Sequence, residues 1–246
     1  MMNKTLVALF ATAALVVGLA DHGPAFAAAG TPSNTGTTSA GGSAAPAKED
    51  GAKPVPATVE GFRSAKFGMG EEDLRKAIRA DFGVKDTDIE RAENPVERTT
   101  ALSVTVKDLL PGGGPARVSY ILGYATKKLI HVNVLWARDL GDTPNETLLA
   151  NASTLQAYLS EQPFQPDNVA MNAPLPDGSV LLFRGSDARS RVVLLTVSGL
   201  ARQAEPGKKP GAKGAGKEAE DRPVIRLSYI ANPAEPDIFR VKPGQF

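Results

Sequence analysis

Residues 118–136 read VSYILGYATKKLIHVNVLW, two apolar runs separated by a short polar stretch. The runs cover 118–124 and 128–136, and the three residues Ala-Thr-Lys between them have the length of a hairpin connection. In the second run, His131 and Asn133 alternate with the apolar side chains, which is the two-residue period of a strand. The side chains expected on the opposite face are Ile130, Val132, Val134 and Trp136. The stretch therefore predicts an antiparallel β-hairpin.

Strand patterns recur on both sides of this hairpin. Leu102, Val104 and Val106 alternate with polar residues, as in a strand with one wet face. Further apolar runs predict strands at 180–183, 191–200 and 224–230. The segment 111–115 reads PGGGP and predicts a turn; it lacks the Gly-Lys-Ser/Thr ending of a phosphate-binding Walker loop.

Two segments have the period of amphipathic helices. One covers 70–82 and is followed by Gly83, a common helix stop. The other opens at Thr143, where Thr143 can cap, Pro144 suits the first helical position and Glu146 can complete a capping box; Pro163 ends it. The predicted buried stripes are Leu74, Ala77, Ile78 and Phe82 in the first helix, and Leu148, Ala152, Leu155 and Leu159 in the second.

The first helix is preceded by a Gly-x-Gly turn, Gly68 to Gly70, which invites comparison with phosphate-binding loops. Glu71, Glu72 and Asp73 fill the first turn of that helix. Three carboxylates would repel a phosphate and already complement the helix dipole. We expect a structural helix start.

The order is a helix and then three strands, twice over. It predicts an α+β fold in which two helices pack on an antiparallel sheet, with a duplicated helix plus three-strand unit as one arrangement of it. One sheet and two small domains both remain open. The domain is expected to span 59–246, interrupted at 203–222 by a disordered loop that carries Lys208, Lys209, Lys213 and Lys217. A solvated linker is the preferred interpretation of this loop, and contact with an anionic surface is the alternative.

The first 27 residues have the three regions of a Sec-type signal peptide. Lys4 precedes an apolar core at 6–20, and Ala25-Phe26-Ala27 is a small-x-small cleavage site. We expect cleavage after Ala27, a periplasmic or secreted protein and no stable membrane anchor; an uncleaved anchor is the alternative. Residues 28–58 are rich in Ala, Gly, Ser, Thr and Pro and predict a disordered linker.

Composition excludes several classes of function. The chain has no cysteine, so disulfides, thiol catalysis and a lipid-modified cysteine are excluded. Its net charge is +1, and cleavage would remove one base and one acid. A chain with so little net charge lacks the excess of basic residues that binds the phosphates of nucleic acids, and we expect no nucleic acid as a partner.

Catalytic and metal-binding motifs are sparse. No Gly-x-Ser-x-Gly elbow occurs, and His131 would be the sole histidine of the mature chain. A lone strand histidine is usually structural, and one histidine without cysteine does not make a usual zinc site. We therefore expect no enzymatic activity, no catalytic residue, no metal and no cofactor.

One segment has the spacing of a calcium-binding loop. The positions that would supply ligands are Asp86, Asp88, Glu90, Ala92, Asn94 and Glu97. Arg91 stands where such a loop needs glycine, Pro95 follows closely, and a strand comes next where a helix should. An accidental match is the favoured interpretation.

Aromatic residues offer one more candidate site. Trp136, Tyr120, Tyr124 and Tyr229 would form a ligand patch if they converged on one face of a sheet, but core packing is the default at strand spacing.

The glycine turn, the acidic helix start EEDLRKAIRADFG at 71–83 and the following strands resemble the small outer-membrane assembly lipoproteins and the related β-lactamase-inhibitor-like folds, over residues 61–136. The resemblance implies binding to other envelope proteins. Membrane anchoring does not carry over, because the chain lacks the lipobox cysteine. We expect a non-enzymatic interaction protein of the periplasm. The alternative is a small-ligand-binding or hydrolytic protein. An apolar pocket with convergent polar groups would favour this alternative, whereas a flat exposed patch would favour the interaction protein.

Overall fold

The computed structural model describes residues 55–200, 222–241 and 244. The described residues from Val55 onward belong to one compact unit. The predicted signal peptide (1–27), residues 28–54 of the predicted linker and residues 203–221 of the predicted loop lie outside the described residues. Within the described ranges, no helix has both the length and the apolar character needed to cross a membrane.

The chain forms a two-stranded sheet, two α-helices and an eight-stranded sheet. The first half contains β1 (Gly61–Phe62), β2 (Ala65–Lys66), α1 (Glu71–Phe82), β3 (Glu90–Glu93), β4 (Thr100–Val106), β5 (Ala116–Leu122) and β6 (Leu129–Ala137). The second half contains α2 (Asn145–Ser160), β7 (Val169–Pro174), β8 (Val180–Ser186), β9 (Val192–Ser198) and β10 (Val224–Ile230). Short 3-10 turns lie at Asp86–Asp88, Arg138–Leu140 and Pro166–Asn168.

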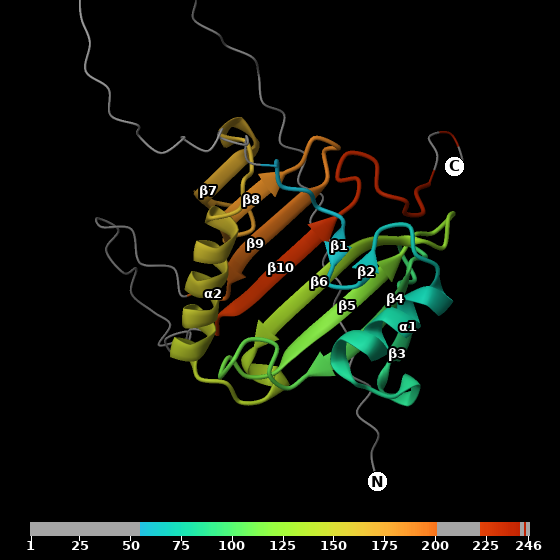
Figure 1. Cartoon of the computed structure of the whole chain (residues 1–246), viewed down its shortest axis with the longest axis horizontal. Helices are drawn as coiled ribbons and strands as arrows, with labels where there is room; N and C mark the ends of the chain where they lie inside the picture. The colour runs from blue at the N-terminus through green and yellow to red at the C-terminus, as the bar shows by residue number, and fades with distance from the viewer. Residues whose placement is uncertain (1–54, 201–221, 242–243, 245–246) are drawn as a thin grey trace, which may run out of the picture. The chain divides into compact units, whose positions relative to one another are not determined.

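The large sheet is antiparallel throughout, in the order β3-β4-β5-β6-β10-β9-β8-β7 (Figure 1). Two four-strand meanders meet at β6 and β10, where Val134 lies opposite Leu227. Each meander follows its own helix in the chain. The α+β prediction is confirmed, and β3 to β10 form one large sheet.

The repeated unit, however, is a helix plus four strands, and the prediction of three strands was wrong. Strands β3 and β7 were missed because they are the two edges of the sheet. All four residues of β3 are exposed, and four of the six in β7 are exposed. A strand without a buried face has no alternation for the sequence to reveal.

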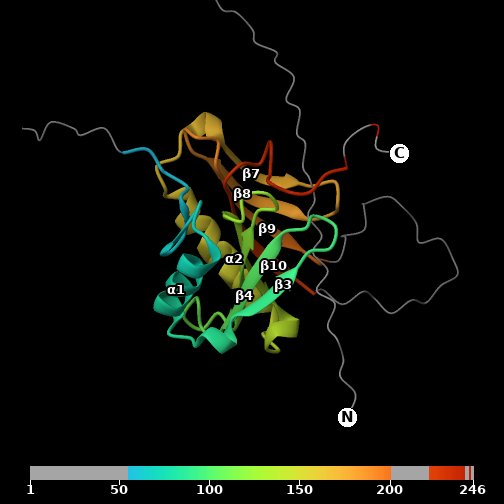
Figure 2. The same ribbon diagram turned by 90° about the vertical axis from the view of Figure 1, so that its right-hand side faces the viewer.

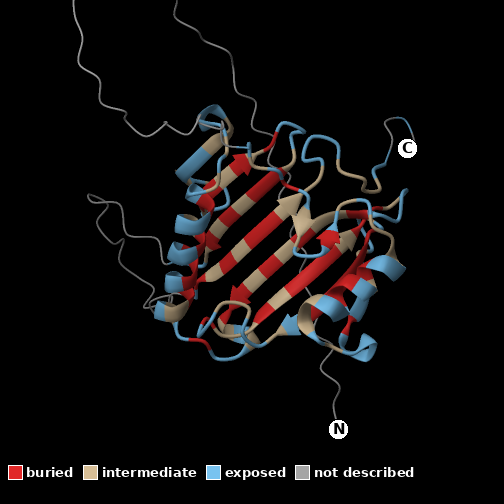
Figure 3. Cartoon of the chain, in the orientation of Figure 1, coloured by how far each residue is buried: buried red, intermediate tan, exposed pale blue. Residues whose placement is uncertain are grey.

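Both helices lie on the same side of the sheet, as the view turned by 90° shows (Figure 2). Their apolar faces join one core with the inward side chains of the strands. Its fully buried members include Leu74, Ile78, Leu148, Tyr120, Trp136, Phe183 and Leu195. The strands are accordingly banded with buried and half-buried residues, while the outer helix surfaces are exposed (Figure 3).

Helix α1 follows its prediction closely. Gly70 is its N-cap, and Gly83 ends it in the left-handed region at φ 64°, donating its N–H to the Arg79 carbonyl. Leu74, Ala77 and Ile78 are buried, and Phe82 packs against the core.

Helix α2 buries the predicted stripe, with Asn151 in addition, but it starts differently. Pro144 is the N-cap, and no side chain caps the helix, so the predicted capping box of Thr143 and Glu146 is wrong. Thr143 is instead buried against the glycine turn: a Cβ built on Gly114 would lie 2.4 Å from its Oγ1. The demands of this packing override the local capping preference. The helix ends at Ser160, before Pro163.

Candidate functional site

The side of the large sheet that faces away from α1 and α2 carries the most distinctive set of side chains; we call it the helix-free face. The strand registers align its residues in rows across the sheet. One row runs through Ser103, Ser119, Asn133, Ser228, Leu194 and Arg184. The next runs through Thr105, Arg117, Leu135, Arg226 and Thr196. His131 and Asn133, which the sequence placed on one strand face, both belong to this side.

The first row begins with a polar track over four neighbouring strands. The Ser103 and Ser119 hydroxyls are 2.9 Å apart and share a hydrogen bond, and the Ser228 hydroxyl donates to Asn133 Oδ1 at 2.6 Å. All three serines are buried. Because these bonds join β4 to β5 and β6 to β10, the track helps to hold the sheet together across its centre.

Around this track, half-buried aliphatic side chains are interspersed with arginines. The aliphatic residues are Ile121, Leu135, Leu194 and Ile230. Arg117 forms an ion pair with Glu90 of β3. Arg184 and Arg226 are half-buried and have neither a hydrogen bond nor an ion pair with any described residue. An ordinary wet sheet face is dominated by polar side chains, whereas this one combines apolar area with two arginines that form no ion pair with a described residue.

His131 lies on this face between Ile121 and Ile230, the residues opposite it on the two neighbouring strands. Its Nε2 is buried and has no hydrogen-bond partner. Burial lowers the pKa of His131 to about 4, although a hydrogen bond with Asn133 opposes that shift. The imidazole is therefore neutral at pH 7. Within the described residues no hydroxyl bonds to it, and the Ser228 hydroxyl is directed to Asn133. The arrangement does not assemble a nucleophile with a base.

The carboxylates of the calcium-like spacing point to separate partners. Asp86 pairs with Arg75 and Arg79 at 3.2 Å, and Asp88 accepts the Lys85 N–H. Glu90 pairs with Arg117, whereas Glu97 accepts from Asn94 in the β3–β4 turn. In the part of the chain that the structure describes, no group of three or more histidine or acidic side chains is placed to hold a metal ion.

Three of the four aromatic candidates lie on the helix side of the sheet, where they belong to the core and not to an open ligand patch. Tyr120 and Trp136 are fully buried in the core, and Tyr229 packs against it; burial raises the pKa of Tyr229 to about 12. Tyr124 lies in the β5–β6 turn, edge-on to Phe239. The core-packing interpretation holds for the first three.

At the glycine turn before α1, cations of the chain itself compensate the acidic residues. Glu71 accepts hydrogen bonds from Arg75, while Glu72 and Asp73 both approach Lys76. The helix start thus carries an internal ion-pair network.

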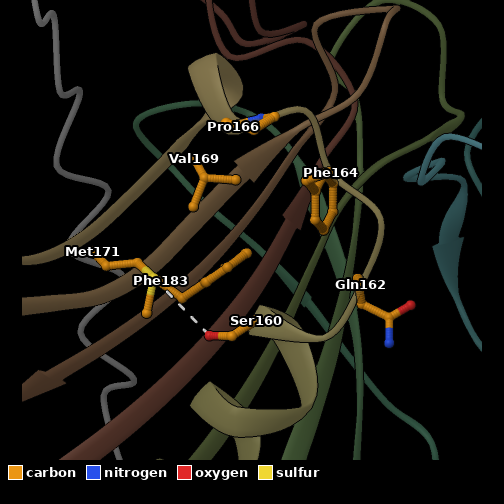
Figure 4. Close-up of a pocket in the computed structure, with 7 residues that line it drawn as sticks. All are labelled: Ser160, Gln162, Phe164, Pro166, Val169, Met171 and Phe183. Atoms are coloured by element: carbon orange, nitrogen blue, oxygen red, sulfur yellow. Dashed lines mark hydrogen bonds between the residues drawn. The ribbon is translucent and has the colours of Figure 1, made fainter.

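An apolar pocket of about 440 Å³ lies between the end of α2 and the edge strand β7 (Figure 4). Phe164, Pro166, Val169, Met171 and Phe183 line it, together with Ser160 and Gln162. The Ser160 hydroxyl and the Gln162 amide donate to backbone carbonyls of α2 at 2.8 and 3.2 Å. The two polar side chains of the lining are thus engaged with the helix backbone, and none of the lining side chains is titratable. A small-ligand site usually has several polar groups that converge on the ligand.

Sequence reasoning missed Arg184, Arg226 and Leu194. The alternation within 180–186, 192–198 and 224–230 carried a signal for them, since each lies at an outward position of its strand. Comparisons with family models, curated proteins and solved structures found no match for this chain, and the resemblance over residues 61–136 stays a prediction.

Proposed function

We propose that this chain is an exported, non-enzymatic protein of the cell envelope that binds another protein through its helix-free face. The observation that carries the proposal is the combination, on one sheet face, of half-buried aliphatic side chains with two unpaired arginines. Contiguous surfaces of this kind are typical of protein interfaces, in which aliphatic area and arginine both contribute.

The titratable groups near this face support binding over catalysis. His131 is neutral at pH 7 and lacks a catalytic neighbour among the described residues. The pocket beside β7 supports a small-ligand function less well, because its polar side chains are engaged with the helix backbone. Export rests on the sequence pattern of residues 1–27.

Affinity capture with matched variants tests the proposal. The mature chain would be immobilised and exposed to an extract of its own periplasm, alongside Leu194→Glu on the helix-free face and Leu149→Glu on α2. Leu149 is a suitable control because it is 42% exposed on the helix side of the sheet. Leu194→Glu should lose the captured protein and Leu149→Glu should keep it, both with unchanged circular dichroism. Equal capture by the two variants would place the binding surface elsewhere. N-terminal sequencing of the exported protein tests cleavage after Ala27.

A further inference from the structure

We propose that the helix-free face binds an extended acidic segment of its partner, in which carboxylates alternate with aliphatic side chains. This inference rests on the proposed function and adds the chemistry of the partner.

Charge complementarity carries the first step. Of the described arginines in the strands of the large sheet, Arg91 and Arg117 pair with glutamates, whereas Arg184 and Arg226 pair with no acid. Asp177, in the β7–β8 turn, accepts hydrogen bonds from the Ser179 N–H and hydroxyl at 3.0 and 2.6 Å. Those bonds lower the pKa of Asp177, and the charge of Arg226 contributes less. Two half-buried guanidinium groups therefore remain to be neutralised by a partner, and carboxylates can accept from both in bidentate geometry.

Spacing carries the second step. Arg226 is on β10 and Arg184 on β8, so β9 separates them, and their partners on β9, Thr196 and Leu194, are two residues apart. Two strand spacings and two residues along a strand place the two Cα atoms about 12 Å apart. In an extended chain, residues i and i+4 are about 13 Å apart on the same side. Such a segment would present a carboxylate to each arginine and its i+2 side chain to Leu194.

The aliphatic residues around the arginines favour a polypeptide over a nucleic acid as the partner. Leu135 separates Arg117 from Arg226, and Leu194 separates Ser228 from Arg184. Aliphatic side chains of a partner can bury this area. The described strands direct their Tyr, Trp and Phe side chains to the helix side; these residues are Tyr120, Trp136, Phe183 and Tyr229. His131 is the one aromatic ring that these strands place on the helix-free face, whereas single-stranded nucleic acids stack their successive bases on several rings.

The test uses the mature chain and a fluorescein-labelled pool of extended peptides with Glu at every fourth position and Leu, Ile or Val midway between. A second pool carries Gln in place of Glu. Fluorescence anisotropy should show tighter binding of the Glu pool. Arg184→Gln and Arg226→Gln should each weaken that binding roughly tenfold, about 1.4 kcal/mol, and reduce the difference between the pools. Lys76→Gln, which removes one positive charge from α1 on the opposite side, should change nothing.

Equal binding of the Glu and Gln pools would overturn the inference. The inference would also be overturned if Lys76→Gln weakened peptide binding as much as the arginine variants do. A third contrary result would be that the chain binds phosphatidylglycerol vesicles but no peptide, and that both arginine variants lose the vesicle binding. The capture experiment separates the two proposals. If Leu194→Glu loses the partner while both arginine variants keep it, the acidic segment is wrong and the docking face stands. If Leu194→Glu keeps the partner, the docking face itself is wrong.

Discussion

Replacing His131 with phenylalanine should flatten the dependence of folding stability on pH. The imidazole lies between Ile121 and Ile230, and its buried Nε2 has no partner, so a phenyl ring can occupy the site without breaking a hydrogen bond of that atom. Burial lowers the pKa of His131 to about 4 in the folded chain, against an ordinary value of 6.5.

The sign follows from proton binding. Between pH 6.5 and 4 the unfolded chain holds a proton on this residue that the folded chain excludes, so acidification stabilises the unfolded state. This pKa shift corresponds to a loss of about 2 kcal/mol of unfolding free energy when the pH falls from 7 to 5. Because the side chain is partly exposed, we expect a loss of about 1 to 2 kcal/mol. The contribution is fully present above pH 6.5 and is lost as the pH falls toward 4.

Urea denaturation at pH 7 and pH 5, followed by circular dichroism, measures this difference. Carboxylates with ordinary pKa values titrate little in that window, and His131 is the one histidine after residue 27. The wild-type chain should lose about 1 to 2 kcal/mol of unfolding free energy between these pH values, and His131→Phe should lose much less. Equal slopes in the two proteins would refute a depressed histidine pKa, and with it the desolvation of the His131 Nε2 atom.

Three further tests of the packing use five substitutions and chemical denaturation. Asp187 is buried and accepts hydrogen bonds from the N–H groups of Val59, Arg189 and Arg191 at 2.9 to 3.0 Å, so Asp187→Ala should lower the unfolding free energy by about 2 to 4 kcal/mol. Asp177→Ala breaks bonds within one exposed turn and should lower it by about 1 kcal/mol. Equal losses would contradict the bond to Val59. Gly113→Ala should lower the unfolding free energy by about 1 to 3 kcal/mol, because the added Cβ would lie 2.6 Å from Asn151 Oδ1 and disturb the 2.8 Å hydrogen bond that Asn151 donates to the Gly113 carbonyl. An unchanged denaturation midpoint would mean that the turn does not pack on α2. Leu74→Ala should lower the unfolding free energy by about 2 to 5 kcal/mol because Leu74 is fully buried. Glu72→Gln should lower it by about 0.3 to 0.5 kcal/mol, because the ion pair of Glu72 with Lys76 is exposed. Similar losses would argue against a buried face of α1.

Local patterns were sufficient to predict the elements that bury one face. The stripes of α1 and α2 and the hairpin of β5 and β6 follow from the periods of their apolar residues, because burial imposes those periods. The edge strands β3 and β7 were missed since nearly every residue in them is exposed. The cap of α2 was misassigned because Thr143 packs on Gly114, a contact between distant segments.

By itself, the sequence determined that His131 and Asn133 share a strand face and that apolar residues occupy the other. Only the tertiary structure decided what that face contains. The pairing of β6 with β10 joins two meanders that are far apart in the chain, and it brings Ser228 opposite Asn133 and Arg226 beside Leu135. No local period encodes that pairing; it forms because one continuous sheet lets both helices bury their apolar stripes in a single core. The helix-free face, with its two unpaired arginines, is a consequence of that shared core.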